Sequence, residues 1–194
     1  RIDPRATLSF YPKSKLVNNH GLYGELDLTW TNAYGTTDWT SFAGYFNNFQ
    51  NTADGYIAFR RDFTYLYFDF DPTNTGGVKL PAGTSYDYNS LVLFFDSNYR
   101  KKFSFNVQGQ FGQYFNGLRQ NVNVTLNYRV QPYMAFSLNV NYNRIELPKP
   151  YASRDLLLVS PKFDFTFSRK LFWTTYIQYN NQISNMNINS RLQW

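Results

Sequence analysis

The sequence contains no cysteine and only one histidine, and these two shortages exclude whole classes of chemistry. Without cysteine, the 194 residues can form neither a disulfide framework nor a thiolate metal site. With His20 alone, the chain cannot assemble a histidine-paired nucleophile or a multi-histidine metal centre. We therefore predict that the chain is not an enzyme and that it has no catalytic residue, no cofactor site and no metal site.

Charged residues are also scarce. They make up 16% of the sequence, against 21% aromatic residues, whereas a soluble domain usually carries about 25% charged residues. The formal net charge of +6 would permit binding to nucleic acid, but Lys and Arg fall mainly at expected turns such as "NYRKK" and "SRK". Because no basic face is formed, we expect no nucleic-acid partner.

Long apolar runs are missing as well. No run reaches 18 apolar residues, so the sequence predicts no transmembrane helix. The chain has no initiator methionine and no signal peptide, and it opens with "RIDPRATLSFYPK", which already has the pattern of a strand. We expect it to be a piece of a longer protein, with the targeting information upstream.

The sequence is rich instead in strict alternation. In the stretch "QNVNVTLNYRVQPYMAFSLNVNYNRIELPKP", Val, Leu and Tyr take one parity while Asn, Thr and Arg take the other, on both sides of a short turn. Alternation of this kind predicts strands with one apolar and one polar face. No segment has helical periodicity, and eleven strands are expected, near residues 5–12, 22–33, 38–50, 55–70, 84–97, 102–115, 119–130, 134–146, 157–168, 171–181 and 185–194.

The connections between these strands alternate in length. "NTADG", "SNYRKK", "VQPYM" and "SRKL" are tight, whereas "DPTNTGGVKLPAGTS" and "ELPKPYASRD" are long, and the shorter "AYGTTD" and "FNGLR" fall on the same side as the long ones. This is typical of an up-and-down meander that crosses a bilayer, with tight periplasmic turns and loops outside the cell. The predicted fold class is all-β: a transmembrane antiparallel up-and-down β-barrel, partial, of about 11 long strands. Residues 1–194 are expected to form one outer-membrane barrel domain.

A barrel would explain the two parities. The outward parity of a membrane barrel meets lipid, and the inward parity meets water or packed polar groups. Amides and hydroxyls can bond to each other and to water there without the cost of a desolvated charge, which fits a mean hydropathy of −0.50. The residues predicted to point outward are Val122, Val124, Leu126, Phe136, Leu138, Val140, Phe163, Phe165 and Phe167.

The four tryptophans, Trp30, Trp39, Trp173 and Trp194, lie near the ends of expected strands. Tyr and Trp are favoured at the depth of lipid headgroups, so these residues suit interfacial belts. The alternative is that the aromatic residues fill the core of a soluble β-sandwich or small barrel, such as an aromatic-rich carbohydrate-binding module.

Three stretches resemble a known family. "VKLPAGTSYDYNSLVLFFDSNYRKKFSFNVQGQFGQYFNG", "YRVQPYMAFSLNVNYNRIELP" and "LFWTTYIQYNNQISNMNINSRLQW" resemble the C-terminal barrel, a domain of unknown function, of large Bacteroidota-type outer-membrane proteins. In such proteins the barrel commonly follows a region like a family 9 carbohydrate-binding module, which is absent from this chain. The resemblance covers about residues 60–194, and residues 1–60 only loosely, through "TLSFYPKSKL".

The resemblance implies a protein of the Gram-negative outer membrane. Its partners would be the lipid bilayer and lipopolysaccharide, with other outer-membrane proteins and glycans as further candidates. We predict a non-enzymatic channel, or a barrel subunit of a larger outer-membrane assembly. In the first case a polar lumen passes small solutes, and in the second the lumen is plugged and the long loops bind other proteins.

The family continues past "RLQW" with further strands. Read alone, "INSRLQW" also imitates a C-terminal barrel-assembly signal, with Ile188, Leu192 and Trp194 on one parity. About eleven strands is an odd number, whereas bacterial single-chain barrels close with an even number. We therefore expect strands 5–12 and 185–194 either to lie at the edges of an open, curved sheet or to pair with further chain.

The remaining polar candidates have ordinary explanations. His20 in "VNNHG" is predicted to be a solvated turn residue. Asp69, Asp71 and Asn74 could bind calcium, but their stretch "FDFDPTNTGG" lacks the bidentate Glu and the central Gly of a calcium loop, and it suits a turn.

Paired carboxylates are the last candidates for chemistry. Glu25 and Asp27 share a parity on the second expected strand. Asp62 and Asp69 are paired in the same way, but with less regularity. Inward charges of a barrel are expected to pair with inward Arg or Lys, or to line a pore. In "DWTSFAGYFNNFQN" both parities are aromatic, so the pattern does not determine the register of this strand.

Overall fold

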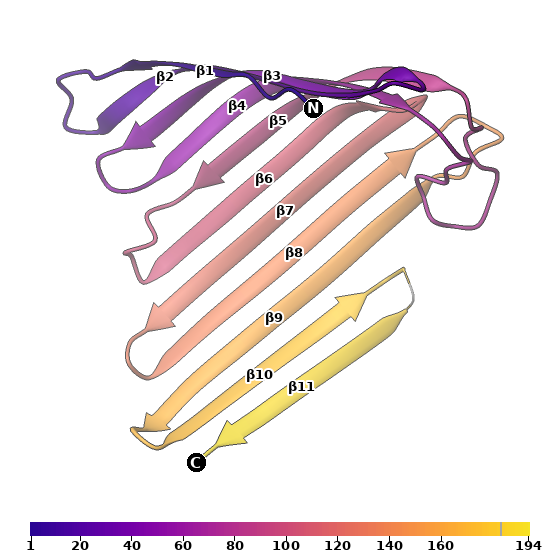
Figure 1. Ribbon diagram of the computed structural model, residues 1–194. Helices are drawn as coiled ribbons and strands as arrows, with labels where there is room; N and C mark the ends of the chain where they lie inside the picture. The colour runs from indigo at the N-terminus through magenta and orange to yellow at the C-terminus, as the bar shows by residue number, and fades with distance from the viewer. Residues whose placement is uncertain (183) are drawn as a thin grey trace.

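In its described residues the chain forms one sheet of eleven antiparallel strands, each paired with its neighbours in sequence (Figure 1). The structure is a computed structural model that describes residues 1–182 and 184–194. None of these residues belongs to a helix long and apolar enough to cross a membrane. The strands are β1 (Arg5–Phe10), β2 (Val17–Thr31), β3 (Gly35–Phe49), β4 (Asp54–Tyr65), β5 (Ser85–Asp96), β6 (Phe103–Tyr114), β7 (Gly117–Val130), β8 (Met134–Glu146), β9 (Arg154–Ser168), β10 (Leu171–Asn180) and β11 (Asn185–Gln193).

The pairing register keeps like residues opposite each other. In β7 and β8, Leu126 faces Leu138 and Val124 faces Val140, while Thr125 faces Asn139. A slip by one residue would move every side chain to the other face of the sheet, so this register is strongly specified. The predicted all-β, up-and-down arrangement is confirmed.

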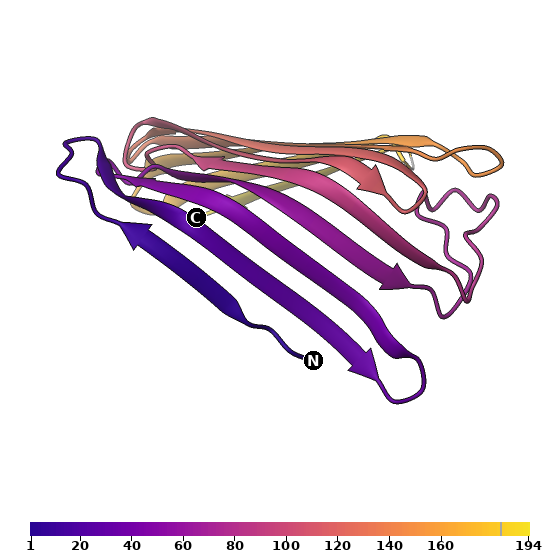
Figure 2. The same ribbon diagram turned by 90° about the horizontal axis from the view of Figure 1, so that it is seen from above.

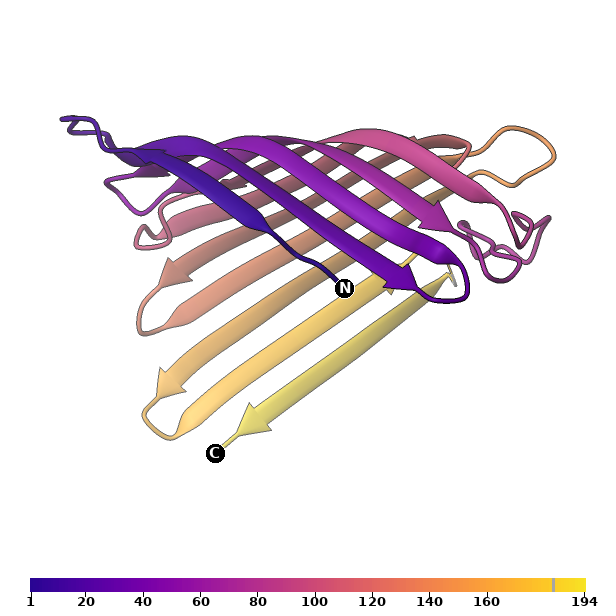
Figure 3. The ribbon, with the colours of Figure 1, turned by 45° about the horizontal axis from the view of Figure 1, so that its top comes forward.

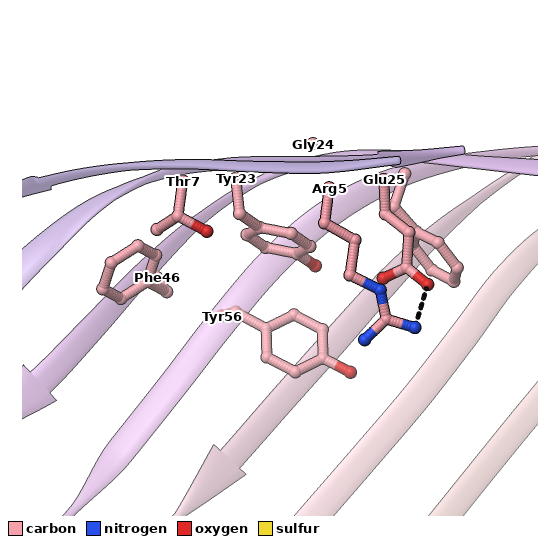
Figure 4. Close-up of a pocket in the computed structure, with 8 residues that line it drawn as sticks. Arg5, Thr7, Tyr23, Gly24, Glu25, Phe46 and Tyr56 are labelled. Atoms are coloured by element: carbon pink, nitrogen blue, oxygen red, sulfur yellow. Dashed lines mark ion pairs between the residues drawn. The ribbon is translucent and has the colours of Figure 1, made fainter. Parts of the chain in front are cut away.

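The sheet is curved into a trough. In Figures 1 and 3, β1–β5 form a roof and β6–β11 descend from it as a wall, and Figure 2 shows the same curvature from above. Side chains of the roof, such as Tyr23 and Glu25, hang toward the inside of the trough (Figure 4). We call this concave side the hollow face and the convex side the outer face.

The two faces differ as the alternation predicts. The hollow face carries Asn, Ser, Thr and Gln from the parity of Asn123 and Asn139, while the outer face carries the opposite parity. Register pairs and the stacking of Phe167 on Phe165 place all nine residues that we predicted to point outward on this one face. Large apolar side chains stand exposed there, including Leu8, Leu22, Ile57, Phe59, Ile188 and Leu192.

The sheet is not closed. Among the described residues, β1 pairs only with β2 and β11 only with β10, so each has an unpartnered edge. The expected edge positions of the first and last strands are confirmed. The full cylinder that defines a barrel is not observed.

The second strand begins earlier than predicted. β2 starts at Val17 instead of residue 22, because the Asn-rich segment that resembles a turn pairs with β3. His20 faces Phe10 and Asn47, its ring stacks on Phe10 at 5.6 Å, and the Tyr45 hydroxyl lies 3.0 Å from its Nδ1. The prediction of a solvated turn residue is therefore wrong.

The fourth strand is shorter than predicted. β4 ends at Tyr65, and the segment read as its continuation to residue 70 belongs to a folded loop. Asp69 consequently lies in that loop and not on the strand of Asp62, so these two carboxylates share no strand face. The loop turns away because Asp69 accepts a hydrogen bond from the Ala82 N–H, at 2.9 Å.

The two longest connections lie at the same end of the trough, as expected, and the short connections 32–34 and 115–116 lie there too. One end of the trough, the tight-turn end, carries the connections 11–16, 50–53, 97–102, 131–133 and 169–170. The opposite end, the long-loop end, carries the connections 66–84 and 147–153 (Figure 1, right). We call the connection 66–84 the mouth loop.

Candidate binding face in the hollow

Amide and hydroxyl groups of the hollow face bond to one another across the strands. Asn139 donates to Asn123 Oδ1 and to Thr125 Oγ1, both at 2.9 Å. Gln110 donates to Ser90 at 3.1 Å. Neutral polar groups in such networks are satisfied without carrying charge into a confined space. The hollow face is therefore suited to water or to polar solutes.

Beside the β1 edge, charges on the hollow face occur as ion pairs. Arg5 lies 3.1 Å from Glu25, and Arg1 pairs with Asp27. The predicted shared face of Glu25 and Asp27, and their pairing with arginine, are thus confirmed. No three His, Cys, Asp or Glu side chains within 1–182 and 184–194 gather into a group that could hold a metal ion.

One hollow-face ion pair is deeply buried. Asp62 is only 4% exposed, and its oxygens accept hydrogen bonds from Arg60 at 2.7 Å and from the Thr40 hydroxyl at 2.6 Å. The Arg60 guanidinium also lies over the Phe42 ring, 5.1 Å from its centroid. A carboxylate this buried depends on its partners, because it has little access to water.

Aromatic rings interrupt the polar hollow face beside the β1 edge. Tyr23 of β2, Phe42 and Phe46 of β3 and Tyr56 of β4 line a pocket of about 460 Å³, with Arg5 and Glu25 at its rim (Figure 4). We call these four rings the aromatic shelf. The Tyr23 and Tyr56 rings meet edge to face at 5.8 Å, and Tyr56 stacks on Phe94 of β5 at 5.2 Å.

Small residues beneath the aromatic shelf make room for it. Gly44 lies between Tyr23 and Ala58 in the register. A Cβ atom on Gly44 would come within 2.5 Å of Tyr23 Cε1 and 2.8 Å of the Ala58 Cβ. The absence of a side chain at Gly44 thus allows the Tyr23 ring to pack down onto the sheet.

Comparison with protein-family models, with curated proteins and with solved structures finds no match. The resemblance to the Bacteroidota-type barrel therefore stays a prediction from the sequence.

The mouth loop is an ordered structure with a small core of its own. Leu80 is fully buried, Thr73 is 1% exposed, and Phe70 and Leu80 exchange backbone hydrogen bonds at 2.9 and 2.7 Å. The Phe70 ring packs on Phe115 at 5.4 Å, and Phe115 in turn contacts Tyr88 of the hollow face at 5.5 Å. The mouth loop therefore packs against aromatic residues at the rim of the hollow.

Asp71 organises the mouth loop. Burial alone would raise the pKa of its carboxyl. The carboxylate, however, accepts hydrogen bonds from the Thr73 hydroxyl and from the backbone N–H groups of Thr73, Gly76 and Thr75. These bonds outweigh the effect of burial and lower the pKa to about 2. Asp71 and Asn74 were two of the residues considered as calcium ligands. The Asp71 oxygens accept hydrogen bonds from the mouth loop itself, and the Asn74 backbone oxygen accepts one from Arg154 at 3.4 Å.

We expect Asp71→Asn to loosen the mouth loop, because the amide has one acceptor oxygen in place of two charged ones. In the wild-type protein the carboxylate contributes stability above its ordinary pKa near 3.8, and this contribution is lost as the pH falls through about 2. Limited proteolysis at pH 7 should cut the variant faster between residues 66 and 84.

Lys79→Gln is the matched control, since Lys79 is an exposed residue of the same loop. Its cleavage rate should equal that of the wild type. Equal rates for Asp71→Asn and Lys79→Gln would show that the Asp71 hydrogen bonds do not hold the mouth loop.

Charges on the outer face are concentrated toward the long-loop end. Arg61 donates to Asp87 at 2.9 Å, where β4 ends and β5 begins. Arg144 pairs with Glu146 and lies 3.8 Å from Asp155, where β8 ends and β9 begins. The central outer face of these strands remains apolar.

The tryptophans divide between the two ends of the outer face. Trp30 and Trp39 lie near the long-loop end of β2 and β3, and Trp39 stacks parallel to Phe63 at 6.3 Å. Trp173 begins β10 near the tight-turn end, and Trp194 follows β11 at that same end. Their predicted positions near strand ends are confirmed.

Proposed function

We propose that the chain forms part of the wall of a transmembrane β-barrel in the outer membrane of a Gram-negative cell. The observation that carries this proposal is the outer face, where apolar side chains follow one another across neighbouring strands. Ile57 is 47% exposed, Phe59 is 53% exposed and Ile188 is 60% exposed. A soluble monomer rarely exposes a contiguous apolar surface of this extent, whereas a lipid bilayer covers it.

The dimensions of the strands suit a bilayer. A tilted transmembrane strand needs about 9–11 residues, and β2–β10 contain between 10 and 15. Tryptophan at both ends and ion pairs at one end would then lie at the depth of the headgroups and of lipopolysaccharide. The bilayer and lipopolysaccharide are thus the proposed partners of the outer face.

The hollow face would line the lumen. Its networks of Asn, Thr and Gln present donors and acceptors to water, and several of its charges are paired. We therefore propose a non-enzymatic role, as a channel for polar solutes or as a barrel subunit of a larger outer-membrane assembly. The mouth loop, with its ordered core, would narrow the lumen entrance or provide a surface for another outer-membrane protein.

The alternative is a soluble, aromatic-rich carbohydrate-binding module. The aromatic shelf is the observation that favours it, because exposed rings in a sheet are a common sugar-binding surface. The outer face weighs against it, since a soluble module would leave Phe59, Ile188 and Leu192 in water.

Extraction of cell envelopes separates the two functions. We expect the full-length protein to stay in the outer-membrane pellet after washing with sodium carbonate at high pH and to dissolve only in detergent. An outer-membrane barrel of known topology is the positive control. Release of the full-length protein by carbonate, in monodisperse form, would contradict the membrane proposal and favour the soluble module.

A further inference from the structure

We propose that the aromatic shelf is a binding site for a neutral saccharide, with one hexose ring packed against Tyr23 and Tyr56. The inference deepens the proposed function, because it assumes that the hollow is open to solutes. It assigns a ligand class to one region of the hollow face, the part of β1–β4 beside the first edge of the sheet.

The rings stand on the face that carries polar side chains in other strands. Elsewhere on this face, as in β7 and β8, Asn and Thr face each other across the sheet. In β2, β3 and β4 the same parity carries Tyr23, Phe46 and Tyr56 instead. Aromatic residues on an inward parity do not contribute to the lipid face, so packing against lipid does not explain them.

The rings also present surface to open space. The pocket above them holds about 460 Å³, within the range of about 300–1,000 Å³ that small-molecule sites occupy. Gly44 lets the Tyr23 ring lie against the sheet, and Tyr23 and Tyr56, which meet edge to face, both line the pocket (Figure 4). The negative face of an aromatic ring attracts the slightly positive C–H groups along one side of a sugar ring.

The rim of the pocket determines the charge of the ligand. Arg5 pairs both with Glu25 at 3.1 Å and with Asp3 at 3.0 Å. With one guanidinium facing two carboxylates, the rim gives no net attraction to an anion. It still offers carboxylate oxygens, guanidinium N–H groups and the hydroxyl of Thr7, which suit the many hydroxyl groups of a sugar.

A saccharide fits both properties, since it combines apolar C–H faces with a neutral, hydroxyl-rich edge. An acyl chain would leave the charged rim unsatisfied, and a phosphorylated ligand would meet the carboxylates of Glu25 and Asp3. The pocket thus favours a neutral hexose over these two classes.

The test measures binding of maltohexaose and cellohexaose to the full-length protein in detergent micelles, by isothermal titration calorimetry. Polyethylene glycol of similar length is the probe without a sugar ring. We expect saturable binding of at least one hexasaccharide and none of the glycol. Tyr56→Ala should weaken binding at least tenfold, while Tyr56→Phe, which keeps the ring, should stay within about threefold of the wild type.

Tyr45→Ala is the matched control, because Tyr45 lies on the adjacent strand with its side chain on the outer face, 41% exposed. It should leave the affinity unchanged. If Tyr56→Ala fails to fold, Thr7→Trp takes its place, since it fills the pocket from the exposed strand β1 and removes no ring, and it should abolish binding.

Three results would overturn the inference: no saturable binding of either hexasaccharide, equal binding of the glycol, or unchanged affinity in Tyr56→Ala or in its replacement Thr7→Trp. The outcome is separate from the membrane proposal. A protein that is released by carbonate but still binds sugar through Tyr56 would support the saccharide site and contradict the membrane proposal. A protein that stays in the membrane but binds no sugar would support the membrane proposal and contradict the saccharide site.

Discussion

Leu138→Arg is expected to destabilise the protein folded in liposomes by about 2–4 kcal/mol, the cost of a cation at mid-membrane depth on the lipid face of a barrel. Leu138 lies in the middle of β8 and faces Leu126 and Pro161 on the neighbouring strands. No acidic side chain is opposite it in this register, so the guanidinium would have no partner. Urea titration of the liposome-bound protein measures the change in unfolding free energy.

The control is Asn139→Arg, one residue further along the same strand. Asn139 lies on the hollow face, where its side chain bonds to Asn123 and Thr125. Arginine there loses two hydrogen bonds but keeps access to water, so the expected cost is smaller. Equal loss of stability in the two variants would contradict the assignment of the outer face to lipid.

Arg60→Leu is expected to cost about 3–5 kcal/mol, because it removes one partner of a buried ion pair and leaves the other without its counter-charge. Asp62 is 4% exposed, and without Arg60 it would retain only the hydrogen bond from the Thr40 hydroxyl. The double variant Arg60→Leu with Asp62→Leu should recover much of the loss, since no buried charge then remains.

Arg61→Leu provides the comparison at the adjacent position. Arg61 pairs with Asp87 on the outer face, where both side chains are substantially exposed, and exposed pairs contribute little. Its effect should therefore be much smaller than that of Arg60→Leu. If the double variant at 60 and 62 is no more stable than Arg60→Leu alone, Asp62 does not depend on its ion pair.

Much of this fold is predictable because its strands are amphipathic from end to end. In the middle of β7 and β8, over residues 121–128 and 136–143, polar and apolar residues alternate with a period of two, and the predicted range 134–146 is the observed one. Prediction fails where local composition and tertiary pairing disagree. Asn18 and Asn19 suit a turn, yet they belong to β2, because β3 pairs along that segment. The stretch after Tyr65 looks like a strand, yet side chains such as Asp71 fold it into a loop.

The candidate site was predictable only in part. The pairing of Glu25 and Asp27 with arginine follows from the cost of inward charges, although the particular partners, Arg5 and Arg1, come from β1 and the residues before it. The aromatic shelf was missed because "DWTSFAGYFNNFQN" is aromatic on both parities. The sequence does place aromatic residues on the polar parity of neighbouring strands, which could have indicated the shelf. Only the register, however, shows that Tyr23, Phe46 and Tyr56 meet.

The two edge strands run in the same direction, and this limits how the sheet could close into a barrel. In an up-and-down sheet of eleven strands, β1 and β11 both run toward the tight-turn end. If the trough curled until β1 and β11 met, these two strands would pair in parallel. The same parallel pair would form if a second copy were added by rotation about the axis of the trough. All ten existing strand pairs are antiparallel. Closure with antiparallel pairs throughout requires an odd number of additional strands between β11 and β1. The first and the last of these additional strands must run toward the long-loop end.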